Sequence, residues 1–120
     1  MSNFSVGFRT TGPVTILDLN GELDAHTASE LEAAIQKCKD DKLVKIVVNG
    51  DQLQYISSAG LGVFMAYIEE VRELGGDIKI ACLQPKVFNV FDLLGFPLLF
   101  EIVKEESDAI ALFENVSSSK

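Results

Sequence analysis

Short apolar segments of strand length recur along the chain. Residues 4–9 and 14–20 flank the turn signal Thr11-Gly12-Pro13, which predicts a hairpin at the edge of a sheet. Three later strands are predicted at residues 43–48, 78–82 and 96–104. Because residues 43–48 are rich in β-branched side chains and apolar on both faces, we expect them to form a central strand that helices cover.

Between these strands the apolar residues follow the spacing of amphipathic helices. The first helical stripe comprises Leu31, Ala34, Ile35 and Cys38. Thr27 and Glu30 have the form of a capping box, in which both side chains satisfy free amides at a helix start. We therefore expect the first helix to begin near His26 or Thr27.

Three further helices are predicted. The second has the stripe Leu61, Phe64, Met65, Ile68 and Val71, and the third has the stripe Val87, Val90, Phe91 and Leu94. Gly75-Gly76 ends the second helix, while Pro85 and Gly95 fit the first turn and the end of the third. Ser107 is a candidate cap for a fourth helix.

The predicted order, β-β-α-β-α-β-α-β-α, is typical of an α/β domain with a mixed, mostly parallel sheet and about four helices. With 120 residues there is room for one domain, which we assign to residues 1–116, followed by a polar tail at 117–120. In such a sheet, ligands and partners are expected at strand ends where a loop leads into a helix.

Composition and charge narrow the functional classes. The chain is 48% hydrophobic and has 18 acidic against 10 basic residues, which gives a net charge of −8. This charge repels nucleic-acid phosphates and anionic lipid surfaces, so neither is an expected partner. No apolar run approaches the ~20 residues that span a bilayer, and residues 1–10 lack the pattern of a secretory signal. We therefore expect a cytoplasmic protein.

The cysteines and the histidine give no indication of a cofactor. Cys38 and Cys82 could pair, but in a domain with an adequate core we interpret them as two buried thiols. Together with His26, the single histidine, they do not have the spacing of a metal site. No complete dinucleotide-binding motif or P-loop is present, so ATP, if involved, belongs to a partner.

The segment 51–62 (DQLQYISSAGLG) links the predicted central strand to the second helix and is the most informative one. Ser57 or Ser58 can cap that helix. Gly60 and Gly62 can allow close packing of the helix on the sheet. The same geometry suits Ser58 as a phosphoacceptor. Free amides and the positive end of the helix dipole stabilise an attached phosphate, which adds about −1.5 to −2 charges at neutral pH.

Through these residues the chain resembles the anti-sigma factor antagonists, whose fold is called the STAS domain, over nearly its whole length. Residues 19–24 (LNGELD) look like the family's L-x-G-E-L-D stretch, and residues 56–62 (ISSAGLG) look like its D-S-S/T-G-L-G loop. Gly75-Gly76 and the run at residues 91–96 (FDLLGF) also follow the family order. Together these motifs are specific.

The resemblance implies a non-enzymatic regulator of bacterial transcription. In that family, the unmodified antagonist binds an anti-sigma factor that is also a serine kinase, and this releases a sigma factor to RNA polymerase. The kinase reverses this partner switching by phosphorylating the loop serine, and a phosphatase resets it. Ser58 matches the phosphorylated serine.

The resemblance also implies a partner-binding face around the loop. Its expected members are Glu22, Asp24, Ser57, Ser58, Ala59, Gly60 and Gly62. Glu22 and Asp24 are expected to lie beside the loop and to give this face an acidic rim.

Two positions depart from the family motif. Ser57 stands where the family has an aspartate, and Ala59 stands where it has serine or threonine. A carboxylate beside the acceptor would orient the hydroxyl of Ser58 or assist the kinase, and a serine supplies no such charge. This departure favours an alternative function, a scaffold or signalling-interaction protein of the same fold that is not phosphorylated.

An enzymatic alternative is a small hydrolase that uses Ser58 as its nucleophile. The nucleophile elbow G-x-S-x-G requires glycine where Ile56 stands. The single histidine, His26, precedes the serine, whereas the hydrolase order puts it downstream. A catalytic serine needs a base within hydrogen-bond reach, and the sequence offers only this imidazole. The sequence therefore disfavours hydrolysis.

Overall fold

The apolar segments assemble into one five-stranded sheet in the computed structural model, which describes residues 3–118 and the side chains of residues 3–114. β1 (Phe4–Thr11) and β2 (Val14–Leu23) form the predicted antiparallel hairpin. The other strands are β3 (Lys45–Ile56), β4 (Asp77–Ala81) and β5 (Ile102–Val103), each parallel to its neighbour. The spatial order is β1-β2-β3-β4-β5, so β1 lies at an edge and β3 at the centre, as predicted.

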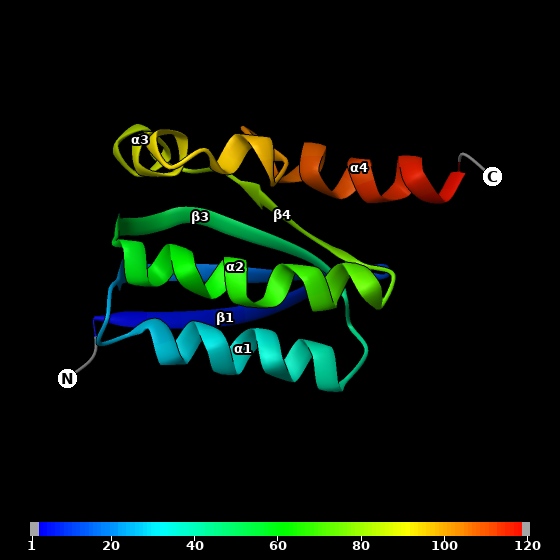
Figure 1. Ribbon diagram of the computed structural model, residues 1–120. Helices are drawn as coiled ribbons and strands as arrows, with labels where there is room; N and C mark the ends of the chain where they lie inside the picture. Colours follow the sequence, from blue (N-terminus) through cyan, green and yellow to red (C-terminus); the bar gives the residue numbers. More distant parts are fainter. Residues whose placement is uncertain (1–2, 119–120) are drawn as a thin grey trace.

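Four α-helices within these residues cover the sheet, in the predicted order of strands and helices. They are α1 (Ala28–Asp40), α2 (Ser58–Glu73), α3 (Pro85–Leu93) and α4 (Glu106–Ser118). Figure 1 shows α1 and α2 side by side in front of the sheet, with α3 and α4 along its upper side. No helix in the described range combines the length and the apolarity that a bilayer crossing requires.

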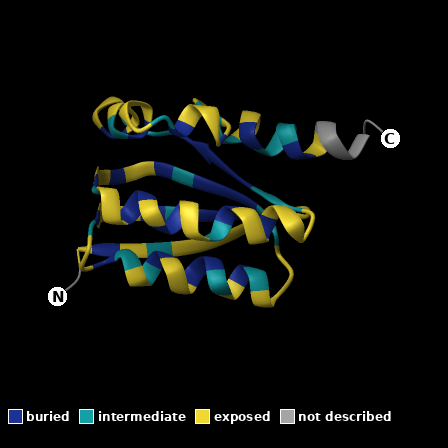
Figure 2. Cartoon of the chain, viewed as in Figure 1, coloured by how far each residue is buried: buried dark blue, intermediate teal, exposed yellow. Residues whose placement is uncertain are grey.

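Both faces of the sheet carry a buried core. Ile46 and Val48 of β3 belong to the larger core, which α1, α2 and α3 cover, whereas Val47 belongs to a smaller core under α4. Successive strand residues point to opposite faces, so α4 packs on the face opposite to the other three helices. Figure 2 shows the same pattern, with buried stripes turned toward the sheet and exposed residues on the outer sides of the helices.

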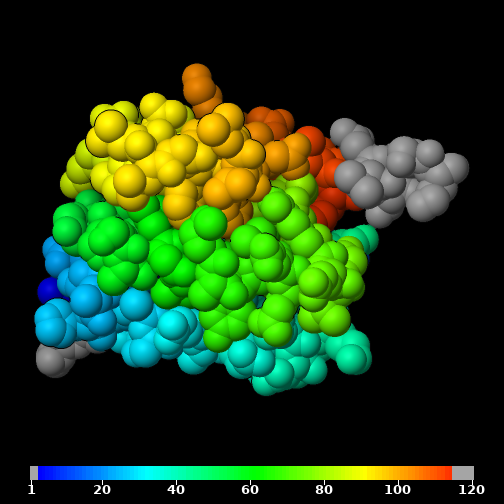
Figure 3. Space-filling view, in the orientation of Figure 1, coloured from blue at the N-terminus to red at the C-terminus, as the bar shows by residue number. Residues whose placement is uncertain are grey.

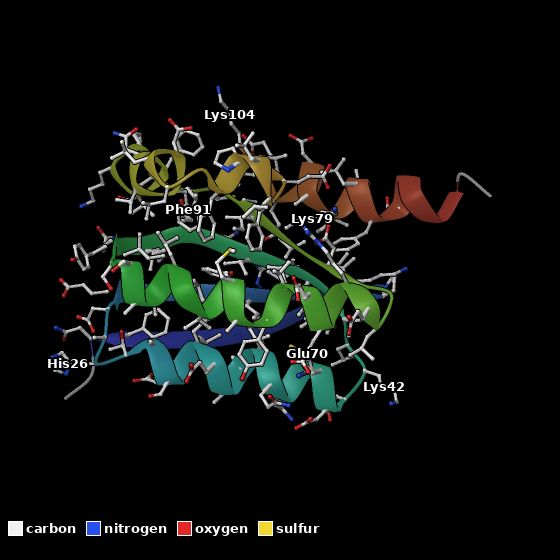
Figure 4. All side chains as sticks on the ribbon, in the orientation of Figure 1. His26, Lys42, Glu70, Lys79, Phe91 and Lys104 are labelled. Carbon is white, nitrogen blue, oxygen red and sulfur yellow. The ribbon has the colours of Figure 1, made fainter. Side chains whose placement is uncertain are left out.

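The core under α4 contains a buried charge. Lys79 of β4, labelled in Figure 4, is only 4% exposed. Its Nζ lies 3.0 Å from Asp77 Oδ2 and 4.8 Å from the centroid of the Phe113 ring, and it also pairs with Glu101. Burial of an ammonium is costly without such partners. Lys79 therefore ties Phe113 of α4 to the sheet.

An ion-pair network holds the start of α4 against the hairpin. The Arg9 guanidinium donates to Asp18 Oδ2 at 2.6 Å and Oδ1 at 2.7 Å, and to Glu106 Oε1 at 2.6 Å. Asn49 Nδ2 donates to the same Glu106 oxygen at 2.8 Å. These bonds to Arg9 and Asn49 lower the pKa of Glu106. The first turn of α4 is thereby joined to β1 and β3.

The central strand is longer than predicted. β3 continues to Ile56 instead of ending at residue 48, so the expected loop begins only at Ser57. The pairing of β2 with β3 shifts register near Asn20 and again near Gly21. Such bulges break the period-two alternation of exposed and buried residues. The exposed polar residues after Gly50 therefore had the pattern of a loop.

The predicted strand at residues 96–104 is wrong for most of its length. Phe96–Leu98 form a short 3₁₀ helix, η1, and only Ile102–Val103 pair with β4. Gly95 adopts a left-handed conformation with φ +77°, and Pro97 favours a helical turn after it. The rings of Phe96 and Phe100 then stack at 5.0 Å, a contact between residues four apart that an extended strand cannot make.

The side-chain caps predicted for α1 and α4 are wrong. Thr27 is the N-cap residue of α1, but its hydroxyl does not cap the helix. It donates instead to the Glu22 carbonyl at 2.8 Å and accepts from the Asp24 amide at 2.9 Å. Ser107 lies inside α4, because the helix begins at Glu106. At α1 the Thr27 hydroxyl is used by the preceding turn, and at α4 the first turn is held by the bonds of Glu106 to Arg9 and Asn49.

Smaller departures concern individual side chains. Met65 on α2 and Leu94, the residue after α3, belong to the predicted apolar stripes, but both are exposed. Cys38 is a buried free thiol, whereas Cys82 follows β4, is also free and is only half-buried. Burial raises the pKa of both thiols. Of the expected tail, residues 117 and 118 continue α4, and residues 119 and 120 lie outside the described residues.

Replacing Phe64 with alanine tests the larger core. Its ring is fully buried and lies 6.1 Å from Phe91 and 6.3 Å from Phe100, measured between centroids. We expect Phe64→Ala to lower the free energy of unfolding by about 3–5 kcal/mol, through lost transfer energy and a cavity. Met65→Ala is the matched control on the exposed side and should change it by less than about 1 kcal/mol. Equal losses in denaturant titrations would contradict this core.

Replacing Glu106 with glutamine tests the ion-pair network. A carboxylate with a lowered pKa in the folded protein stabilises it above the unfolded pKa of about 4.3, and this stabilisation disappears as the pH falls through the folded value. We expect Glu106→Gln to cost roughly 1 kcal/mol at neutral pH and nothing in acid. Glu105→Gln is the control, because no ion pair of Glu105 occurs within the described residues. A pH-independent cost in urea unfolding would refute the assignment.

Candidate functional site

The ends of β2 and β3 and the starts of α1 and α2 meet at one end of the molecule, at the left in Figure 1. Leu23 pairs with Ile56 at the last position of the two strands. One residue further on, the Ser57 amide donates to the Leu23 carbonyl at 3.0 Å. The two sequence motifs are therefore neighbours across these strand ends.

Ser57 caps α2. Its backbone is extended, with φ −105° and ψ 173°, and its Oγ accepts from the Gly60 amide at 3.4 Å. Its carbonyl accepts the first helical hydrogen bond, from the Leu61 amide at 3.1 Å. Of the two serines that the sequence offered as caps, Ser57 therefore has this role.

Ser58 is the first residue of α2 and is exposed. Within the described residues its hydroxyl makes no hydrogen bond, and the amides of Ser58 and Ala59 have no acceptor. Free amides at a helix start carry partial positive charge. The hydroxyl is thus open to solvent beside two unused donors, and the cap does not depend on it.

Gly60 is required by the contact between α2 and β2. A Cβ at this position would lie 2.7 Å from Leu23 Cγ and 3.1 Å from Ile56 Cγ1. Gly62 has no such constraint, because its Cβ would meet nothing within 4 Å, so the expectation of close packing there is wrong. Ser58, Ala59 and Gly62 instead form an exposed surface of small residues on α2.

Glu22 and Asp24 lie beside the loop, but their surroundings differ. Glu22 is exposed, pairs with Tyr55 in the sheet, and forms no ion pair among the described residues. Asp24 is half-buried, and its Oδ1 accepts from the amides of His26 at 2.9 Å and Thr27 at 3.2 Å. Asp24 therefore shapes the turn before α1, whereas Glu22 presents its carboxylate to solvent.

Two exposed side chains, one on β3 and one on α2, escaped the sequence analysis. Tyr55 is exposed at the end of β3, in a segment that had the pattern of a loop. Met65 is exposed on α2, and its place in an apolar stripe concealed this. Ser58 and Met65 are seven residues apart, almost two full turns, so they lie along one side of the helix. Exposed residues therefore extend from the serine along α2.

In the part of the chain that the structure describes, neither a histidine base nor a cluster of metal ligands is assembled with Ser58. His26 is exposed in the turn before α1 (Figure 4), and no hydrogen bond joins its imidazole to either serine. No three His, Cys, Asp or Glu side chains among residues 3–114 are grouped so that they could hold a metal ion. The site offers a hydroxyl, two helix-start amides and an exposed face.

Known proteins share both the sequence pattern and the fold. The STAS domain family model matches residues 6–109. The anti-sigma F factor antagonist of Paenibacillus polymyxa is 31% identical over 108 residues, which cover 87% of this chain and 90% of that protein. This similarity extends over nearly the whole of both chains.

Two solved structures have the same fold. An anti-sigma factor antagonist from Mycobacterium paratuberculosis has a TM-score of 0.83 at 22% identity, covering 91% of this chain and 92% of that one. The Bacillus cell fate determinant SpoIIAA in its phosphorylated form has a TM-score of 0.68 at 22% identity, covering 92% and 98%. Since the family model spans most of the sequence and a relative is 31% identical, the chain belongs to the STAS-domain family of anti-sigma factor antagonists.

Proposed function

We propose that this protein binds an anti-sigma factor that is also a serine kinase, and that phosphorylation of Ser58 ends this binding. Binding then releases a sigma factor, and a phosphatase restores the unmodified state. The observation that carries the proposal is the division of roles at the start of α2. Ser57 caps the helix, which leaves the Ser58 hydroxyl exposed and without a hydrogen bond among the described residues.

The unmodified face suits close contact with a protein. Ser58, Ala59 and Gly62 are small and exposed, so a partner can approach the backbone of α2. Tyr55 adds an exposed aromatic ring at the end of the adjoining strand. Aromatic side chains beside small residues are typical of interface centres, because they bury much area with little loss of side-chain entropy.

Phosphorylation changes the charge of this face and requires no change in the fold. A phosphoserine carries about −1.5 to −2 charges at neutral pH. At Ser58 it would lie beside the free amides of Ser58 and Ala59 and the positive end of the α2 dipole, which stabilise it. A partner surface matched to a neutral hydroxyl would then meet a desolvated dianion. Binding is lost through charge and bulk.

A scaffold of the same fold that is not phosphorylated is the second candidate. The observation that favours it is Ser57, which supplies no carboxylate next to the acceptor. A kinase would have to orient the Ser58 hydroxyl without that charge. In support of the switch, a relative of the same fold, SpoIIAA, has been solved in a phosphorylated form.

The switch can be tested with the purified anti-sigma factor kinase from the same organism. With ATP, we expect one phosphate, which mass spectrometry places on Ser58. Ser58→Ala should bind like the wild type, and Ser58→Asp should bind roughly tenfold or more weakly, because it adds charge at the interface centre. Ser107→Asp is the matched control, an exposed serine in the first turn of α4. Phosphate on another serine, or equal binding by Ser58→Asp, would disprove the switch.

Changing Ser57 separates its capping role from its effect on the kinase. Aspartate and serine are equally good caps, so Ser57→Asp should keep the stability while restoring a carboxylate beside the acceptor. We expect faster phosphorylation of Ser58 in this variant. Ser57→Ala should lose about 1 kcal/mol of stability, and Ser58→Ala almost none. If neither the wild type nor Ser57→Asp accepts phosphate from the kinase, the scaffold function is correct.

A further inference from the structure

Four leucines are exposed together where α3 leads into η1. Leu93 and Leu98 are 84% and 90% exposed, and Leu94 and Leu99 are also exposed. We call these four residues the leucine surface. Monomeric proteins seldom present contiguous apolar side chains without a binding role. The question is whether the fold itself needs them.

The fold does not need these leucines, because phenylalanines of the same segment already fill the core. Phe91, Phe96 and Phe100 are buried, and their rings meet at 5.3 Å and 5.0 Å between centroids. Figure 4 shows Phe91 directed from α3 toward the sheet. The leucines lie on the outside of this aromatic base, so their exposure is not a by-product of incomplete packing.

The leucine surface is also held in a fixed shape. Gly95 makes the left-handed turn at φ +77° between Leu94 and η1. Arg72 of α2 donates through Nη2 to the Leu99 carbonyl at 2.6 Å and through Nε to Asp77 at 2.9 Å. A preformed surface loses little conformational entropy when a partner binds.

The leucine surface continues the line of residues that begins at the switch serine. Ser58, Met65 and Arg72 are spaced by seven, which places them along one side of α2, and Arg72 contacts Leu99. In Figure 3, α2 and the α3–η1 segment lie side by side on one face of the molecule. Fourteen residues of helix span about 21 Å. A standard interface of roughly 800 Å² per partner is about 30 Å across, so one partner can cover both ends.

We propose that the leucine surface is a second contact region for the anti-sigma factor that meets Ser58, a proposal that rests on the proposed function. The charges nearby indicate the chemistry of the partner. Glu69, Glu73 and Asp92 are exposed beside this line and have no ion pair within the described residues. The partner surface is therefore apolar and bordered by Lys or Arg. A second copy of this chain would bring together two bodies of charge −8.

The test combines Leu93→Gln with Leu98→Gln. Calorimetric titration of the purified anti-sigma factor kinase, without ATP hydrolysis, should show at least tenfold weaker binding than the wild type. The melting temperature should not fall, because both side chains are outside the core. Leu43→Gln is the matched control, an exposed leucine in the connection between α1 and β3, and should bind like the wild type. Higher salt should weaken wild-type binding, since charges border the contact.

The outcomes separate this proposal from the proposed function. If the wild type binds and Ser58→Asp does not, while the double leucine variant binds as tightly as the wild type, the leucine surface is refuted and the switch stands. If the wild type itself does not bind, the proposed function fails, and the leucine contact fails with it. Light scattering should show a monomer, and a wild-type dimer that the leucine substitutions abolish would overturn the proposal in favour of a second copy.

Discussion

The close approach of α2 to the end of β2 determines the geometry of the site. Gly60 packs against Leu23 at a distance that leaves no room for a side chain, and the Ser57 amide bonds to the Leu23 carbonyl. These two contacts fix where the helix begins and which serine caps it. Because Ser57 turns inward to the Gly60 amide, Ser58 has to face solvent. A packing constraint in the backbone thus decides which hydroxyl a partner can reach.

The same helix connects the site to the rest of the molecule. On its inner side, Phe64 packs into the aromatic cluster formed with Phe91 and Phe100. On its outer side, the exposed small residues near Ser58 are followed by Met65. The aromatic cluster is closely packed and holds α3 and η1 beside α2. The outward side chains of these elements can therefore vary without loss of stability. Stability and recognition therefore occupy opposite sides of the same elements.

Local sequence patterns were sufficient to predict the hairpin, the central position of β3 and the helix α2, because turns and helical periods depend on nearby residues. They failed where distant contacts decide. The extension of β3 to Ile56 depends on bulged pairing with β2, and the turn of η1 depends on packing of Phe100 against Phe64 of α2. At the site, the sequence identified the two serines but could not choose the cap, because that choice depends on the contact of Gly60 with Leu23.

The tie between Arg9 and Glu106 joins residues that are 97 positions apart in the chain. During synthesis on the ribosome, the hairpin emerges before the other strands, and α4, which covers the second face of the sheet, emerges after all five strands. Until Phe113 has been made, the smaller core lacks the helix that buries it, and its apolar side chains are exposed. They include Val14, Ile16 and Val47. The nascent chain consequently has an interval in which an apolar sheet face is open to other chains, until α4 covers it.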